Sequence, residues 1–409
     1  MSRTAQSLWA GIYCRTEQPL LEQVALVGYG FSHQVALTPP DGIVLEIGGS
    51  RRLRGGIAPL LETLTGQLSR MGLEARSGLA PVPAAARLLA RIGRWAPTMS
   101  ELHRQLSILS VTDLELPRQQ IDTLTGCGLK TLDQLMRLPA ADRARRFGKA
   151  LNRYLDQIHG RLDTPLAGWT PPERFELRLE MPVASEAVEA LVFVFRRMLE
   201  SLGHWLEIRD QALTRLKVLL EREDDGPPLH FSIGLARPGF DPDRLLELIR
   251  LKLESIRLPA AIDAVALKAD STGEHRPPQA DLLSGINRAD VWPALLDRLN
   301  ARLGEDGLAG LATQPDHRPE RSWTWARPGN TTICREHRPR PTWLLPEPRP
   351  CKPEKFILEE GPERVETGWW DGQDCRRDYW IARDRQQRRL WVFQEYKPRA
   401  GWFIHGIFE

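Results

Sequence analysis

The sequence is poor in cysteine, and the cysteines it has are scattered. Only 5 of the 409 residues are cysteine, without a CxxC pair or a neighbouring histidine in a metal-ligand pattern. A disulfide framework needs paired cysteines, and a zinc site needs clustered thiolate or imidazole ligands. We therefore expect neither a disulfide scaffold nor a metal site from Cys14, Cys127, Cys334, Cys351 and Cys375.

Long apolar runs and a charge excess are also missing. No stretch approaches the roughly 18 apolar residues of a membrane-spanning helix, and the opening MSRTAQSLWAGIYC has no apolar signal-peptide core. Lys and Arg number 56 against 53 Asp and Glu, a formal net charge of +3. The composition favours a cytoplasmic protein with no membrane partner. Any nucleic-acid surface has to come from local clusters of charge.

The chain is long enough for about two to four folded units at ordinary domain sizes. Residues 1–97 alternate between strand-like and helix-like patterns. A turn and a buried strand at 39–49 precede a helical apolar pattern over 57–71, and Gly72 suits the left-handed end of that helix. A strand, a Pro-containing turn and another helix follow at 78–91. This part is predicted to combine sheet and helix.

The rest of the chain divides by pattern into four further segments. Residues 98–168 are predicted to be helical, and residues 169–270 have the order β-α-β-β-α-β of a split βαβ sandwich. Residues 271–355 are rich in Pro, His and Arg, which is typical of a linker, and residues 356–409 have the alternation of a small β-rich module. The predicted fold class is α+β, multidomain. The expected strands of the sandwich are 175–179, 212–221, 229–235 and 261–268, its helices are 188–203 and 241–256, and the linker contains one helix at 289–303.

A glycine-containing turn in the helical segment has the form of a helix-hairpin-helix. In the string GLKTL at 128–132, glycine allows backbone amides to approach a phosphate, and a lysine adds charge. The alternative is an ordinary helical turn beside a solvated basic face. The predicted DNA-binding residues are Gly126, Gly128, Lys130, Thr131, Arg145, Arg146 and Lys149, and Arg143 and Arg153 lie in the same basic stretch.

The order of these segments resembles the palm, thumb and little finger of Y-family DNA polymerases over roughly residues 20–270. The string PPDGIVLEI at 39–47 falls where active members of that family have a Ser-Ile-Asp-Glu motif. Asp41 remains there, but Gly42 replaces the glutamate. Two-metal phosphoryl transfer needs clustered carboxylates that hold two Mg²⁺ ions about 4 Å apart. The resemblance therefore implies a protein without catalytic residues, cofactor or bound metal.

Two further features support this expectation. The strand candidate LWAGIYC contains no acidic residue, and only 40 residues precede Asp41, too few for a complete fingers domain. A substitute site could combine Asp41 with Glu46, but residues five apart on a strand point to opposite faces. Mg²⁺ is expected only if the chain is an active polymerase with a displaced metal site.

The C-terminal half resembles the ImuB proteins of bacterial mutasomes, which are inactive Y-family homologues. The string QADLLSG at 279–285 resembles the clamp-binding pentapeptide of these proteins, with Leu in place of the usual Phe. That change removes aromatic area and is expected to weaken binding, by about 1 kcal/mol. By itself such a string is more often a loop or the start of a helix. The predicted clamp-binding residues are Gln279, Asp281, Leu282 and Leu283.

Two blocks of the tail, DHRPERSW at 316–323 and residues 361–384, resemble the tail of ImuB proteins. The second block interleaves tryptophan and tyrosine with arginine, a composition suited to a contact surface for a protein or for bases. The alternative is a small β core in which the aromatic residues replace a larger apolar interior. The predicted partner-binding residues are Trp369, Trp370, Arg376, Arg377 and Tyr379.

The resemblance implies a non-catalytic adaptor in error-prone translesion synthesis and DNA-damage-induced mutagenesis, including the SOS response. Its implied partners are DNA, the β sliding clamp, a RecA-like mutasome protein and an error-prone C-family polymerase. The implied location is the cytoplasm, at the nucleoid. Two alternatives remain: an active nucleotidyltransferase and a non-functional remnant.

Overall fold

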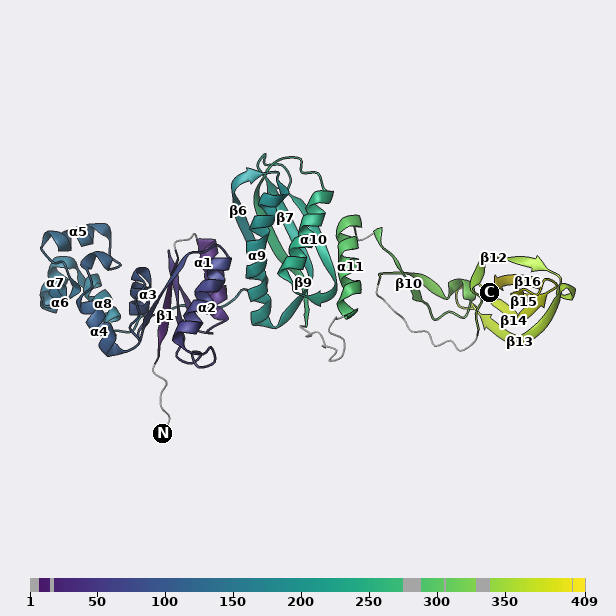
Figure 1. The fold of residues 1–409 in the computed structure, drawn as a ribbon, viewed down its shortest axis with the longest axis horizontal. Helices are drawn as coiled ribbons and strands as arrows, with labels where there is room; N and C mark the ends of the chain where they lie inside the picture. Colours follow the sequence, from purple (N-terminus) through teal and green to yellow (C-terminus); the bar gives the residue numbers. More distant parts are fainter. Residues whose placement is uncertain are drawn as a thin grey trace, which may run out of the picture. The chain divides into compact units, whose positions relative to one another are not determined.

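The chain has a mixed α/β fold with two compact units, Met1–Arg302 and Leu303–Glu409 (Figure 1). The structure is a computed structural model that describes residues 7–14, 18–274, 288–304, 307–328, 339–398 and 400–408. None of the helices within these ranges is both long and apolar enough to cross a membrane.

The first unit begins with a five-stranded sheet in the order β4-β1-β3-β2-β5. The predicted helix at 57–71 is confirmed; it ends at Arg70, and Gly72 follows with φ of 73°. The strand and helix predicted at 78–91 are also present. The elements are β1 (Trp9–Cys14), α1 (Gln18–Tyr29), β2 (Val35–Thr38), β3 (Gly42–Glu46), α2 (Ile57–Arg70), β4 (Ala75–Ala80), α3 (Pro83–Ile92) and β5 (Gly168–Trp169).

Helix α3 lies unusually close to this sheet. A Cβ atom on Gly11 of β1 would lie 2.3 Å from the carbonyl oxygen of Ala86, and one on Gly78 of β4 would lie 2.1 Å from the amide of Ala90. Only glycine on the strands and alanine on the helix allow two backbones to approach so closely. This packing holds Arg87 and Arg91 of α3 near the turn between β2 and β3.

Residues 99–158 form five short helices, as the sequence predicted. Their apolar core includes Leu102, Leu124, Leu151 and Leu155, and it is continuous with Leu88 of α3. The shared core joins the helices to α3. The helices are α4 (Met99–Ser107), α5 (Arg118–Gly126), α6 (Leu132–Met136), α7 (Ala140–Phe147) and α8 (Lys149–Ile158).

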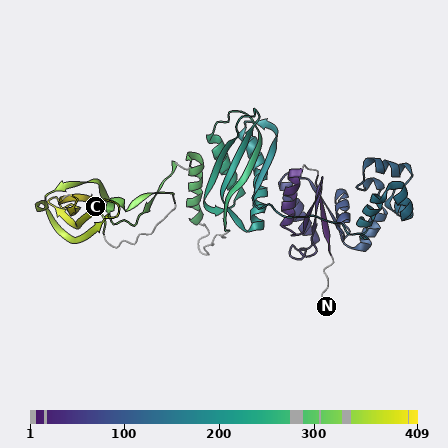
Figure 2. The same cartoon turned by 180° about the vertical axis from the view of Figure 1, so that it is seen from behind.

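The next segment is a four-stranded antiparallel sheet in the order β6-β9-β7-β8, and its predicted order β-α-β-β-α-β is confirmed. Two helices lie against one face of this sheet (Figure 1), and the strands lie in front when it is seen from behind (Figure 2). The elements are β6 (Glu176–Ser185), α9 (Val188–Arg209), β7 (Gln211–Arg222), β8 (Leu229–Gly239), α10 (Pro242–Ser255) and β9 (Ile262–Glu274).

The helix predicted at 289–303 is also present, as α11 (Arg288–Leu303). It is fixed to the edge strand β8 through the buried Asp297, whose Oδ1 accepts a hydrogen bond of 2.7 Å from the amide of Ala236. The same carboxylate forms an ion pair with Arg244 of α10. Because an edge strand presents unpaired backbone groups, this contact covers part of that edge.

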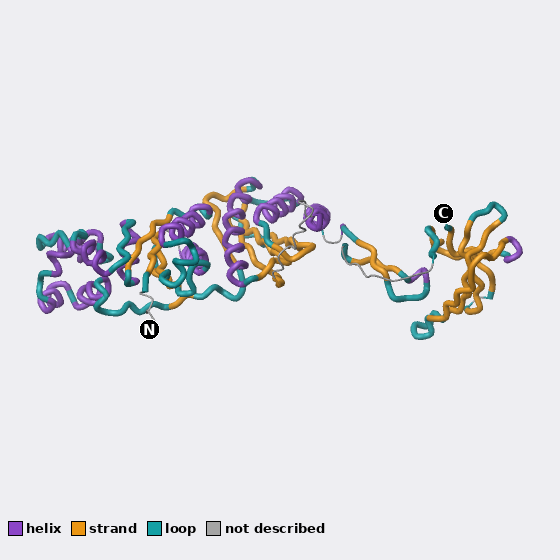
Figure 3. Tube along the Cα trace, turned by 60° about the horizontal axis from the view of Figure 1, so that its bottom comes forward, coloured by secondary structure: helices purple, strands orange, loops and turns teal. Residues whose placement is uncertain are grey.

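The second unit has a β-rich fold, as predicted for the C-terminus, with short 3-10 turns in its described residues (Figure 3). Its five-stranded sheet has the order β12-β16-β15-β14-β13, and β10 pairs with β11 separately. The elements are β10 (Gly310–Thr313), β11 (Trp323–Ala326), β12 (Trp343–Cys351), β13 (Phe356–Thr367), β14 (Cys375–Asp384), β15 (Arg389–Lys397) and β16 (Gly401–Ile407).

One strand of this sheet lies in the segment that we expected to be a linker, 271–355. Strand β12 contains Pro346, Pro348 and Pro350. Because proline is typical of linkers, the sequence did not predict a strand here. Proline cannot donate a ladder hydrogen bond, so it is tolerated mainly in edge strands. Strand β12 is at the edge of the sheet, which explains why the prolines are compatible with it.

Candidate functional site

Asp41, the carboxylate left from the expected metal motif, is held by an arginine. It lies in the turn between β2 and β3, and its Oδ2 is 3.1 Å from Nη1 of Arg91. Gly42 follows as the first residue of β3. A Cβ atom at Gly42 would lie 2.4 Å from the carbonyl oxygen of Ile12 in β1. A glutamate side chain at this position therefore requires the two strands to move apart.

A second carboxylate near Asp41 was missed in the sequence. Glu115 precedes α5, its Oε2 lies 3.0 Å from Nε of Arg87, and its Oε1 lies 3.8 Å from Nη1 of Arg91. Burial raises the pKa of Glu115 above its ordinary value, although both arginines act in the opposite direction. The only sequence signal was the spacing of Arg87 and Arg91 by one helical turn.

Glu46, the other acid considered, has a separate structural role. Its Oε1 accepts hydrogen bonds from the amides of Leu8 at 3.2 Å and Gly48 at 2.9 Å. Within the described ranges, no group of three or more His, Cys, Asp or Glu side chains is arranged to hold a metal ion.

The turn predicted to bind phosphate uses its backbone amides internally. Gly128 has φ of 80°, as a glycine turn requires. However, its amide donates to the carbonyl of Thr125, and the amides of Lys130 and Thr131 both point to the side-chain oxygen of Gln134. The Thr131 hydroxyl completes this capping box. These three amides therefore have partners within the chain, and the exposed Lys130 side chain remains as a phosphate-binding candidate. DNA binding by Gly126, Gly128 and Thr131 stays a prediction.

The basic helices contain both structural and exposed cations. Arg143 is only 5% exposed, so it does not belong to the basic face we expected. It donates hydrogen bonds to three carbonyl oxygens at the end of α6 and to Asn152. Arg146 and Lys149 are exposed, and Arg145 is exposed beside Asp142 at 3.2 Å. DNA binding by these residues stays a prediction.

The clamp-binding candidates Gln279, Asp281, Leu282 and Leu283 lie outside the described residues. The described chain stops on one side of them at the end of β9, Glu274, and resumes at the start of α11, Arg288.

The aromatic and arginine residues of the tail separate into surface and core. Trp369 and Trp370 are 78% and 59% exposed in the loop between β13 and β14, with ring centroids 5.7 Å apart. Tyr379, in contrast, is 1% exposed and stacks on Trp391 at 4.3 Å. Tyr379 therefore belongs to the core of the sheet and does not form part of a contact surface.

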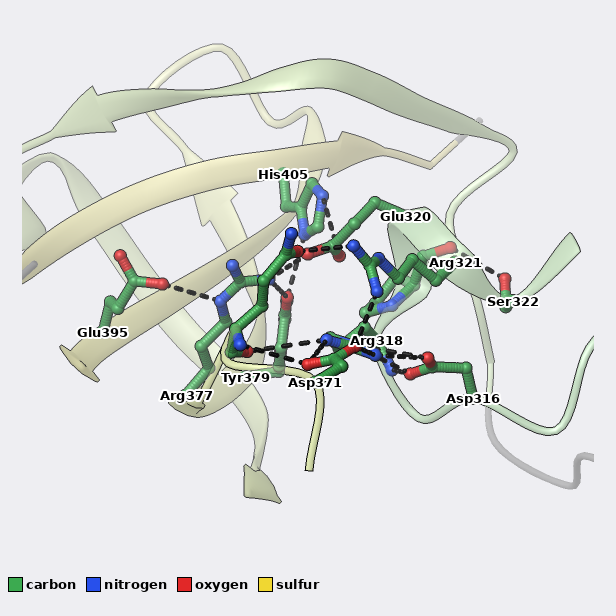
Figure 4. Close-up of polar contacts among 12 residues, drawn as sticks. Asp316, Arg318, Glu320, Arg321, Ser322, Asp371, Arg377, Tyr379, Glu395 and His405 are labelled. Carbon is green, nitrogen blue, oxygen red and sulfur yellow. Dashed lines mark hydrogen bonds and ion pairs between the residues drawn. The ribbon is translucent and has the colours of Figure 1, made fainter. Parts of the chain in front are cut away.

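Arg377 and Arg376 also have contacts within the unit. Nε of Arg377 lies 2.7 Å from Glu395, and its Nη1 lies 2.8 Å from Glu320 (Figure 4). The Arg376 guanidinium lies over the ring of Tyr396 at 5.7 Å. The expectation that Arg377 faces a partner was therefore wrong, because its side chain joins the loop that contains Glu320 to the sheet.

The block DHRPERSW provides an ion-pair network that fixes the loop between β10 and β11 (Figure 4). Arg318 is 4% exposed, and its Nη2 lies 2.7 Å from both Asp316 and Asp371. Arg321 Nη1 lies 2.7 Å from the same Asp371. Hydrogen bonds from Arg318 are the largest influence that lowers the pKa of Asp371 to about 2. The sequence located this block but gave no role to Arg318.

A buried histidine completes this region. His405 is 1% exposed, and its Nδ1 lies 2.9 Å from the hydroxyl oxygen of Tyr379 (Figure 4). Its Nε2 lies 3.9 Å from Glu320. Burial lowers the pKa of His405 to about 4, although Glu320 acts in the opposite direction.

Comparison with known proteins establishes the family. No family model matches the sequence. Two curated relatives, both named "Protein ImuB" and from the Caulobacter vibrioides strains NA1000 / CB15N and ATCC 19089 / CIP 103742 / CB 15, are each 30% identical over 417 residues. The match covers 92% of this chain and 91% of each relative. The chain belongs to the ImuB family.

The ImuB match includes most of both units, so the resemblance of the tail to ImuB proteins is part of a match along the chain. Among solved structures, DinB from Sulfolobus solfataricus matches with a TM-score of 0.33 and 13% identity, over 62% of this chain and 76% of that one. An insertion ternary complex of Dbh DNA polymerase matches with a TM-score of 0.31 over the same shares. TM-scores this low do not establish a common overall fold, so the assignment to the ImuB family rests on sequence identity.

Proposed function

We propose that the chain is a non-catalytic adaptor in error-prone translesion DNA synthesis and DNA-damage-induced mutagenesis. It binds DNA and the sliding clamp and recruits an error-prone C-family polymerase, together with a RecA-like mutasome protein. Support comes from membership of the ImuB family and from the resemblance of residues 20–270 to Y-family polymerases.

The environment of Asp41 is the observation that best supports a non-catalytic role. Its charge is balanced by Arg91 at 3.1 Å, and the neighbouring Gly42 has no space for the glutamate of the motif. Two-metal catalysis requires carboxylates free to bridge two cations. An ion pair with a guanidinium uses the same carboxylate oxygens.

Primer extension tests this role. The full chain, with primer-template DNA, nucleotides and either Mg²⁺ or Mn²⁺, is expected to add no nucleotide. Asp41→Ala is compared with Asp263→Ala, which changes an exposed aspartate on β9. Incorporation that Asp41→Ala abolishes and Asp263→Ala preserves favours the active polymerase instead.

DNA binding is proposed for the exposed cations Lys130, Arg145, Arg146 and Lys149. Each cation that neutralises a phosphate releases counterions, so Lys130→Ala is expected to reduce the slope of log affinity against log salt by about 1. Fluorescence anisotropy with primer-template DNA measures this slope. An unchanged slope removes Lys130 from the interface, and a similar loss in every sequence context identifies a phosphate contact.

Clamp binding is proposed for Gln279, Leu282 and Leu283, with Asp281 between them. Replacing the first three together by alanine is expected to abolish capture of the chain by immobilised clamp. Ser284→Ala is the matched control, because it changes a neighbouring residue that the motif does not require. Capture that survives the triple substitution shows that the clamp binds another part of the chain.

A further inference from the structure

The carboxylates of Asp41 and Glu115 lie on different parts of the first unit, and Arg91 lies between them. Asp41 belongs to the turn between β2 and β3, and Glu115 lies between the 3-10 turn Val111–Asp113 and α5. Nη1 of Arg91 is 3.1 Å from Asp41 and 3.8 Å from Glu115. One nitrogen thus contacts an acid from the sheet and an acid from the helical segment.

We infer that the guanidinium of Arg91 serves as the resident cation of this carboxylate pair and, with Arg87, forms an ion-pair latch between the sheet and the helices. The latch consists of Asp41, Arg87, Arg91 and Glu115. This inference goes beyond the adaptor function and does not depend on DNA, clamp or partner binding.

The arginines of the latch are fixed by further contacts. Nη2 of Arg87 donates a hydrogen bond of 3.2 Å to the carbonyl of Pro39, in the same turn as Asp41. The guanidinium of Arg91 lies 5.3 Å from the ring centre of Tyr13 in β1. A planar guanidinium that stacks on a ring and faces two acids loses little conformational freedom when it binds them.

The acid on the helical side is also fixed. The amide of Glu115 donates a hydrogen bond of 3.2 Å to the hydroxyl of Tyr154 in α8. The side chains of Asp41 and Glu115 are only 15% and 13% exposed. A partly buried carboxylate needs a compensating positive charge. In this latch, two arginines provide two positive charges for two carboxylates.

The latch explains how Asp41 and Glu115 can lie close together without a metal ion, because Arg91 neutralises both carboxylates. A divalent cation between the two acids would have to displace Arg91, and the displaced guanidinium would repel the cation. The same arrangement connects the β2–β3 turn to the helical segment that contains Lys130 and Arg146. The acid retained in the sheet thus has a structural role.

Hydrogen exchange of the full-length chain tests the latch. Arg91→Gln is expected to speed exchange about threefold to fivefold in both 39–42 and 111–117, because a partly exposed ion pair has this effect on local opening. Arg94→Gln, which changes an exposed arginine just after α3, is expected to leave both segments unchanged. Arg91→Lys keeps the charge but loses the planar fork, and should have an intermediate effect.

A double substitution makes the test specific. If Asp41 and Arg91 act through one contact, Asp41→Asn with Arg91→Gln exchanges no faster than the faster single variant. Circular dichroism identifies variants that fail to fold, in which case Arg91→Lys carries the comparison. Additive effects, or no change in either segment with Arg91→Gln, overturn the latch.

Terbium luminescence tests the exclusion of cations, since Tb³⁺ binds carboxylates and is sensitised by nearby tyrosine such as Tyr13 and Tyr154. The wild-type chain is expected to give no emission that depends on Asp41, so wild type and Asp41→Asn should titrate identically. Emission that Asp41→Asn removes overturns the role of Arg91 as the resident cation. DNA and clamp binding are not part of either measurement, so failure of the latch and failure of the adaptor function are distinguishable.

Discussion

The four-stranded sheet β6-β9-β7-β8 and the five-stranded C-terminal sheet are both antiparallel, but their cores are built differently. Helices α9 and α10 cover the four-stranded sheet with side chains such as Phe195 and Leu199, which are fully buried. In the C-terminal sheet, the largest buried cluster contains Tyr379, Trp391 and Phe393. Beside it lies the ion-pair network of Arg318 and Arg377.

The difference shows how a unit built mainly of strands can be stabilised without a layer of α-helices. Helices provide broad apolar faces, so burial of aliphatic side chains is the main source of stability in the four-stranded sheet. In the C-terminal unit, large aromatic rings provide area, and the buried Arg318 and half-buried Arg377 fix the loops around them. The predictions below test whether apolar burial stabilises the four-stranded sheet and whether ion pairs stabilise the C-terminal sheet.

Removing a buried ring from α9 should have the largest effect. Phe195→Ala leaves a cavity in the core of the first unit and is expected to lower its unfolding free energy by about 3–5 kcal/mol. Phe193→Ala is the matched control on the same helix, because Phe193 is 76% exposed, and it should change this free energy by less than about 0.5 kcal/mol. Denaturant unfolding, monitored by hydrogen exchange in α9, measures the unfolding free energy of both variants. Similar losses from the two variants would contradict the assigned core.

Removing the buried cation of the C-terminal unit should have the next largest effect. Arg318→Gln leaves Asp316 and Asp371 without their shared partner, and we expect a loss of stability smaller than that from Phe195→Ala. Hydrogen exchange in β11 and β14 of the full chain measures this loss. Arg385→Gln changes an exposed arginine in the turn after β14 and should have little effect. If Arg318→Gln also has little effect, ion pairs do not stabilise this unit.

Local periodicity predicted much of the fold but little of these polar contacts. The β-α-β-β-α-β segment was recognisable because strands and helices have different apolar periods. Contacts such as Arg91 with Glu115 and Arg318 with Asp371 join residues far apart in the chain, and no local pattern specifies them. Strand β12 was missed because its prolines are typical of linkers.

The alternation of side chains along a strand could have improved the prediction of which tail residues belong to the core and which to the surface. Arg377, Tyr379 and Ile381 are two residues apart on β14, so they share one face of the sheet. Tyr379 and Ile381 both belong to the buried cluster. The mixture of aromatic residues and arginine gave the composition of a contact surface, but strand period decides which of them face the interior.

The buried histidine predicts a pH dependence in the C-terminal unit. The pKa of His405 falls from 6.5 to about 4 on folding, so between these pH values the unfolded chain binds a proton that the folded unit does not. Stability is therefore complete above pH 6.5 and falls as the pH is lowered towards 4. Hydrogen exchange in β15 and β16 should show this fall.

The control for this pH effect is another histidine of the same unit. His405→Gln should flatten the dependence, while His317→Gln, at an exposed position, should keep it. Glu320, Arg377 and Tyr379 also face His405. A dependence that persists in His405→Gln therefore assigns the titration to a group other than His405.

Removing the exposed tryptophans should have the smallest effect on stability. Trp369 and Trp370 contact each other but are mostly exposed, so replacing both by alanine should change the unfolding free energy by less than about 0.5 kcal/mol. If they contact a partner, the same variant should lose capture of the error-prone polymerase or of the RecA-like protein. Trp391→Ala is the contrast, because it removes a buried ring of the same sheet and should unfold the unit. A large loss of stability from the Trp369 and Trp370 variant would assign these side chains to the fold, whereas unchanged stability with lost capture would assign them to the contact surface.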